Sequence, residues 1–94
     1  MVSGVPKTPK PPASGLAGTF GARLRQIRTS KKLVQLELAY KCGCTVSDIS
    51  NYERGQMLPS FETLIDLAYG LGIDAAELTR GLQPDTPPIE RLGR

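Results

Sequence analysis

Histidine and tryptophan are absent from this sequence of 94 residues, and the only sulfur ligands besides two methionines are two cysteines. A structural zinc site needs about four ligands, so we expect no metal site and no cofactor. Without histidine, the sequence shows no recognisable pair of nucleophile and base, and no metal cluster. We therefore expect that the protein is not an enzyme.

Long apolar runs are also missing. No run approaches the roughly 20 residues that cross a bilayer, and the N-terminus lacks the apolar segment of a secretory signal. Cys42 and Cys44 are one residue apart, a spacing at which an intrachain bridge is strained. These absences predict a soluble, cytoplasmic protein without a membrane contact. We interpret both cysteines as small buried hydrophobes, with a redox-sensing thiol or a metal site in an oligomer as alternatives.

Proline and glycine divide the chain into three parts. Residues 1–18 contain four prolines and three glycines and cannot bury enough apolar surface to offset the entropy of ordering, so we expect a disordered N-terminal arm. Residues 83–94 have a similar composition and are expected to form a flexible C-terminal tail. One domain is therefore expected over residues 19–82.

Within that domain the apolar residues recur at helical spacing. Phe20, Leu24 and Ile27 follow one another at steps of four and three residues, and the later segments show comparable stripes. Capping residues precede the expected helices and glycines end them; the residues concerned are Thr19, Thr45, Ser60 and Asp74 at the starts, and Gly43, Gly55 and Gly72 at the ends. The sequence predicts a compact all-α domain of five short helices.

Charge is distributed unevenly along the chain. Five basic and no acidic residues lie between Gly21 and Lys32, whereas four acidic and no basic residues lie between Gln56 and Thr79. With a net charge of +3, this polarity is compatible with a nucleic-acid partner.

The segment around Gly43 has the spacing of a helix-turn-helix. A helix of about eight residues, a three-residue turn and a helix of about nine residues follow one another. Ala39 is small enough for the two axes to approach closely, Cys44 is expected to point between them, and Ile49 is expected to pack back. In the DNA-binding version of this motif, the helix after the turn enters the major groove.

The segments "LRQIR", "QLELA", "ISNYERG", "LPSFETL" and "LAYGLG" occur in this order around Gly43. In order and spacing they resemble the lambda-repressor-like, or Cro/C1-type (XRE), helix-turn-helix family, over about Phe20 to Leu78. The resemblance implies the five-helix lambda-repressor-like fold. It also implies a sequence-specific regulator of transcription in a bacterium or phage, a homodimeric repressor that binds a pseudo-palindromic operator in double-stranded DNA.

The same resemblance implies which residues face the bases. They are Val46, Ser47 and Asn51. Val46 offers only apolar contact, for which a thymine methyl is the natural partner, and Ser47 is poorly selective. The Asn51 amide can pair with N6 and N7 of adenine, so Asn51 is the best expected base reader.

Other positions are implied to contact the DNA backbone or to support the recognition helix, residues 45–54. The expected backbone contacts are Gln35, Thr45, Arg54 and Gln56. The resemblance also implies a pair between Arg28 and Glu53 that joins the first helix to the third. Lys7 and Lys10 are interpreted as solubilising residues, with a basic arm that reaches DNA as the alternative.

Two positions depart from the family pattern. Val34 replaces the usual capping serine or threonine, so the start of the second helix is expected to fray, and Leu36 replaces a polar residue. These departures favour the alternative function, a protein-interaction module of the same fold such as an antitoxin or a polymerase-docking accessory protein. The expected dimer surface is the fifth helix, about Ala75 to Leu82, and the tail after it. No second domain is visible, so no small-molecule ligand is expected.

Overall fold

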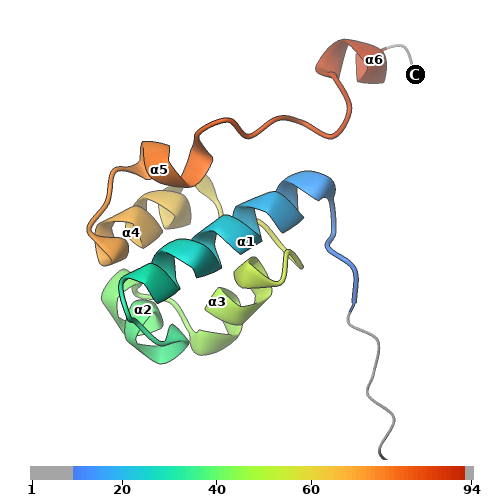
Figure 1. Cartoon of the computed structure of the whole chain (residues 1–94). Helices are drawn as coiled ribbons and strands as arrows, with labels where there is room; N and C mark the ends of the chain where they lie inside the picture. Colours follow the sequence, from blue (N-terminus) through green and yellow to red (C-terminus); the bar gives the residue numbers. More distant parts are fainter. Residues whose placement is uncertain (1–9, 93–94) are drawn as a thin grey trace, which may run out of the picture.

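The computed structural model describes residues 10–92, and all its regular structure there is helical (Figure 1). Six helices follow one another along the chain, with these bounds: α1 Gly15–Ser30, α2 Gln35–Cys42, α3 Val46–Glu53, α4 Phe61–Leu71, α5 Ala75–Thr79 and α6 Pro88–Leu92. The predicted all-α class is confirmed, with one more short helix than expected. None of the described residues belongs to a helix that is long and apolar enough to cross a membrane.

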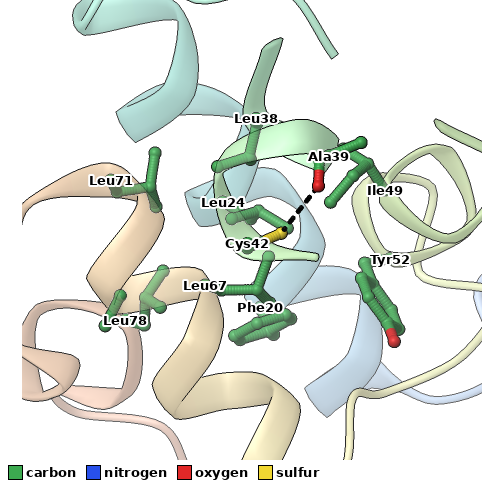
Figure 2. Packing of buried hydrophobic residues seen from close by; sticks show 11 residues of the cluster. Phe20, Leu24, Leu38, Ala39, Cys42, Ile49, Tyr52, Leu67, Leu71 and Leu78 are labelled. Carbon is green, nitrogen blue, oxygen red and sulfur yellow. Dashed lines mark hydrogen bonds between the residues drawn. The ribbon is translucent and has the colours of Figure 1, made fainter. Parts of the chain in front are cut away.

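The core lies where α1, α2, α3, α4 and α5 meet, and it is mainly aliphatic (Figure 2). Its largest fully buried side chains are Phe20, Leu24, Leu38, Ile49, Leu67 and Leu78. Burial of a side chain of this size stabilises the fold by about 1.5–3 kcal/mol, so this small set supplies most of the driving force. Ala39 and Ile49 face each other across the turn between α2 and α3, as predicted.

Helix α1 begins five residues earlier than expected. Ser14, not Thr19, is its N-cap and accepts from the N–H of Ala17 at 3.0 Å. The first two N–H groups of the helix, those of Gly15 and Leu16, donate to the Asp85 carboxylate at 2.8 Å each. A carboxylate at a helix N-terminus also interacts favourably with the helix dipole. This partner 70 residues away explains why a glycine-rich start is helical.

The expected arm, residues 1–18, is therefore helical in its last four residues, while residues 1–9, including Lys7, lie outside the described part. Between them is an extended stretch, Lys10–Ser14, which we call the clasped segment because it is hydrogen-bonded to the end of α3. In the expected tail, residues 88–92 form α6, of which no residue is buried. Figure 1 shows α6 standing away from the other helices.

Several details of the other helices differ from expectation. α5 ends at Thr79 because Arg80 is extended, with φ −56° and ψ 127°, and does not continue to Leu82. Phe61 and Tyr69 of α4 and Tyr40 of α2, which in sequence are candidates for core or dimer contacts, are exposed and do not belong to the core. These side chains lie at the edge of the apolar stripe of their helix. The stripe is wider than the face that packs on the core, so its edge stays exposed.

The missing cap of α2 is compensated from inside the helix. Val34 provides no side-chain acceptor, but Glu37 Oε1 accepts from the Val34 N–H at 2.9 Å. Thr45, Ser60 and Asp74 cap α3, α4 and α5 as predicted.

Gly21 is the point of closest approach between α1 and α3. A Cβ atom at this position would lie 2.2 Å from the carbonyl oxygen of Tyr52 and 2.7 Å from that of Glu53. Both atoms belong to the backbone, so a side chain at Gly21 must push the two helices apart. Gly43 is different, because a Cβ there would have nothing within 4 Å and only its φ of 72° is unfavourable.

These two glycines give a matched test of the packing. We expect Gly21→Ala to lower the free energy of unfolding by about 3 kcal/mol, the cost of overpacking against a rigid neighbour. Gly43→Ala should cost only about 1 kcal/mol, the penalty of a left-handed residue. Urea denaturation followed by circular dichroism measures both values, and equal costs would contradict the close approach of α1 and α3.

Candidate nucleic-acid interface

The turn between α2 and α3 is built by glycine and held by the backbone. Gly43 has φ 72° and ψ 26°, and the N–H of Cys44 donates to the carbonyl of Ala39 at 2.9 Å. This is the Schellman arrangement, in which a left-handed residue lets the chain satisfy the last carbonyls of a helix and turn away. Two residues later Thr45 starts α3, so the turn fixes where the new helix begins.

The start of α3 is fixed by a reciprocal cap. Thr45 Oγ1 accepts from the N–H of Asp48 at 3.0 Å, and Asp48 Oδ2 accepts from the N–H of Thr45 at 3.4 Å. Thr45 is the N-cap, as predicted, and with Asp48 it forms a capping box in which aspartate takes the place of the usual glutamate. The Asp48 carboxylate therefore serves to cap α3.

The end of α3 is tied to α1 through an ion pair. Arg28 Nε and Nη2 donate to the two carboxylate oxygens of Glu53, at 2.6 and 3.0 Å, in the two-pronged geometry that guanidinium favours. The Arg28 side chain is 11% exposed and that of Glu53 only 3%. The hydrogen bonds to Glu53 raise the pKa of Arg28 above its ordinary value, which burial alone would lower. Arg28 Nη1 also donates to the carbonyl of Leu33 at 2.7 Å.

Gln35 joins the same carboxylate from the first residue of α2. Its Nε2 donates to Glu53 Oε1 at 3.0 Å. A carboxylate only accepts hydrogen bonds, so the NH₂ end of the amide must face Glu53, and its second N–H remains for another acceptor. Glutamine is therefore the residue type that can brace α3 and still donate outward.

Three residues point out of α3 on the side that the core does not cover. Val46 and Ser47 are exposed in its first turn, and Asn51 is half-buried in its second. Arg54, just after the helix, lies back along this face, with Nη1 donating to Ser50 Oγ and Nη2 to Asn51 Oδ1, both at 2.6 Å. Asn51 Oδ1 keeps its second lone pair and the amide keeps both N–H donors.

Gln56 lies where the sequence places it, just after α3, but its side chain is engaged with the clasped segment. Its Nε2 donates to the carbonyl of Pro11 at 3.1 Å. This contact could not be predicted from the sequence, because a proline-rich stretch has no helical period and its partner is 45 residues away.

Two arginines of α1 have structural partners, and the other described basic residues of the first half do not. Arg23 donates to the carbonyls of Leu78 and Arg80 at the end of α5, at 3.3 and 2.7 Å, and Arg28 is paired with Glu53. The remaining basic residues of the first half are exposed: Lys10, Arg25, Lys31, Lys32 and Lys41. The acidic stretch belongs to α4 and α5, which lie on the other side of α1 from α3 in Figure 1.

The two cysteines have no partner of their own kind. Both are free, and no group of three or more potential metal ligands occurs within residues 10–92. Cys42 is buried in the core (Figure 2), and its thiol donates to the carbonyl of Ala39. Burial, with a further contribution from the neighbouring Cys42, raises the pKa of the Cys44 thiol to about 12.

This geometry defines a helix-turn-helix domain, and the comparison with known proteins agrees. Residues 19–80 match the sequence profile of the helix-turn-helix domain family. The restriction-modification controller protein C.AhdI from Aeromonas hydrophila has a similar solved structure, with 40% sequence identity and a TM-score of 0.65. That match covers 66% of this chain and 94% of the controller.

Two relatives are similar in sequence. The uncharacterized HTH-type transcriptional regulator y4dL of Sinorhizobium fredii is 37% identical over 62 residues, which are 66% of this chain and 32% of that protein. The immunity repressor protein of Bacillus phage phi105 is 37% identical over 60 residues, which are 64% of this chain and 42% of the repressor. The chain thus spans less than half the length of either relative. It belongs to the Cro/C1-type helix-turn-helix family.

The ion pair of α1 and α3 can be tested by removing its carboxylate. Glu53→Ala leaves the buried guanidinium of Arg28 without a counter-charge, and we expect the free energy of unfolding to fall by about 3–5 kcal/mol. Glu90→Ala, in the exposed helix α6, is the matched control and should change stability by less than about 0.5 kcal/mol. Urea denaturation measures the free energy of unfolding of both variants. A small effect of Glu53→Ala would contradict the role of Glu53 in holding α3 against α1.

The thiols should be unreactive in the folded protein. Thiolate, not thiol, reacts with alkylating agents, and a pKa of about 12 for Cys44 leaves almost no thiolate at pH 7.5. We expect iodoacetamide to label neither Cys42 nor Cys44 quickly until guanidinium chloride unfolds the chain. Mass spectrometry of a labelling time course measures this, and rapid labelling of native protein would favour a redox-sensing thiol.

Proposed function

We propose that the protein is a sequence-specific DNA-binding regulator of transcription, which acts in the cytoplasm on the nucleoid. The observation that carries the proposal is the exposed face of α3, capped at Thr45 and braced at Glu53, with small and polar side chains turned outward and basic residues around it. A helix supported in this way fits the major groove of B-DNA, which is wide enough to admit it. Two relatives of this chain are named as a transcriptional regulator and an immunity repressor, which supports the same function.

In this function α3 reads the bases and its surroundings hold the backbone. Asn51 reads adenine, Val46 contacts a thymine methyl, and Ser47 adds a weakly selective hydrogen bond. Gln35 donates its second amide N–H to a phosphate while its first stays on Glu53. Thr45 and Arg54 contact the backbone on either side of the reading face. The structural supports do not touch DNA; they are Arg28, Glu53, Ala39, Gly43 and Ile49.

A single domain of this size reads few base pairs, so we propose a homodimeric repressor on a pseudo-palindromic operator. Two copies placed about one DNA turn apart double the reading surface. The proposed dimer surface includes α5 and the tail after it. Support comes from Phe61 and Tyr69 on neighbouring α4, whose apolar side chains are left exposed by a single chain. No catalytic step, cofactor or small-molecule ligand belongs to this function.

One observation favours a second candidate, a protein-interaction module of the same fold. Leu36 and Tyr40 lie one turn apart on α2 and are 67% and 87% exposed. Apolar side chains that are adjacent and this exposed are typical of protein-contact surfaces. A toxin or polymerase subunit docked there would use the fold without reading DNA.

A salt series separates the two candidates. Fragments of genomic DNA bound by the protein are first selected and sequenced, and binding to a preferred duplex is then measured by fluorescence anisotropy. A DNA-binding regulator loses affinity linearly in log–log form as salt rises, because phosphate contacts release counterions. Absence of salt-dependent binding to any duplex would refute the regulator and leave the interaction module.

The reading role of Asn51 is tested on the same duplex. We expect Asn51→Ala to weaken binding by about 1–3 kcal/mol and to relax the preference at one base pair. Gln35→Ala should instead weaken preferred and unrelated duplexes to a similar extent, because phosphates carry no sequence information. A base preference unchanged by Asn51→Ala would show that another residue reads the sequence.

A further inference from the structure

The clasped segment is bound to the end of α3 by three hydrogen bonds. The N–H of Ala13 donates to the carbonyl of Gly55 at 2.8 Å. The side chain of Gln56 donates from Nε2 to the carbonyls of Pro11 and Lys10, at 3.1 and 3.4 Å. The backbone just before α1 is therefore fixed to the two residues that follow the reading helix.

The packing at this junction is close enough to make the contact specific. A Cβ atom on Gly55 would lie 2.9 Å from both Gly18 Cα and Pro12 Cβ, and a Cβ on Gly18 would lie 3.1 Å from Pro12 Cγ. A side chain at Gly55 would therefore displace the Pro12 ring or α1, and one at Gly18 would press against the same ring. Consecutive prolines also lose little conformational freedom on ordering, because their φ angles are already restricted.

The segment runs along the side of the molecule on which α3 lies. In Figure 1 it descends from the start of α1 past α3, away from α4 and α5 with their acidic residues. Lys10 is exposed at its far end. The one ion pair among the described residues joins Arg28 to Glu53, so the Lys10 ammonium keeps its charge free for a partner. Gln56, whose amide holds the Lys10 carbonyl, is two residues beyond Arg54.

From this placement we infer that Lys10 contacts a DNA phosphate beside the end of α3, and that Gln56 acts as its positioning residue. The inference rests on the proposed DNA-binding function and extends its surface to a segment outside the helix-turn-helix. It also changes the role of Gln56: its amide does not bind the DNA backbone directly but holds the segment that does.

The two roles of Gln56 differ in their dependence on salt. A neutral amide that binds a phosphate releases no counterion, so its loss lowers affinity without changing the slope of log K against log salt. A lysine that neutralises a phosphate contributes about 0.9 to the magnitude of that slope. If Gln56 positions Lys10, removal of either side chain reduces the slope.

The experiment measures this slope for the full chain by fluorescence anisotropy, with the duplex selected above and an unrelated duplex. Because each subunit of the proposed homodimer carries one Lys10, we expect Lys10→Ala to reduce the magnitude of the slope by about 2, or about 0.9 per subunit, on both duplexes. Gln56→Ala should reduce it by a similar amount, and the double variant should show no further reduction. Lys10→Arg keeps the charge and should restore the wild-type slope.

Lys10→Arg also serves as the matched control, because it changes the same side chain and keeps its positive charge. Its slope should equal that of the wild type, and thermal melting should show that all variants are folded. A wild-type slope in Lys10→Ala overturns the phosphate contact. A wild-type slope in Gln56→Ala, with an affinity loss that adds to that of Lys10→Ala, overturns the positioning role.

Failure of the proposed function gives a different result. If the wild-type protein shows no salt-dependent binding to either duplex, both the regulator and this contact are refuted. If the wild type binds and only the Lys10 slope is unchanged, the regulator stands and the contact alone is wrong.

Discussion

The carboxylate of Glu53 is the interaction on which the arrangement of the first three helices depends. It ends α3, and it accepts two hydrogen bonds from Arg28 of α1 and one from Gln35 of α2. Because this carboxylate is almost fully desolvated, none of these partners can leave without a large cost. The aliphatic core holds the helices together, but apolar contacts are not directional. The ion pair adds the direction that fixes how α3 faces outward.

Some of the basic residues have structural partners, so the charge that is available to a binding partner differs from the net charge of the sequence. Arg23 and Arg28 belong to the basic first helix in sequence, yet one closes the end of α5 and the other is paired with Glu53. The exposed basic residues of the first half lie on segments before α3, whereas the acidic helices α4 and α5 lie on the other side of α1 from α3 (Figure 1). Such separation orients a protein toward a polyanion at long range, which a net charge alone does not do.

The sequence predicted best those features whose causes are local. Thr45 with Asp48, Ser60 and Gly43 act within a few residues of one another, so their roles were readable from spacing. The ion pair of Arg28 and Glu53 spans 25 residues and was expected only from the family resemblance. The start of α1 and the engagement of Gln56 were missed, because their partners lie 70 and 45 residues away. Composition predicted a disordered arm before α1 and did not indicate that residues 10–14 would be hydrogen-bonded to Gly55 and Gln56.

The bond between the start of α1 and Asp85 has a consequence for how the chain is made. The N–H groups of Gly15 and Leu16 are synthesised first and their acceptor 70 and 69 residues later. At a synthesis rate of about 5–20 residues per second, the nascent first helix waits roughly 4–14 s for this partner. During that interval Ser14 alone caps the helix. The final stability of α1 is therefore acquired only when nearly the whole domain has left the ribosome.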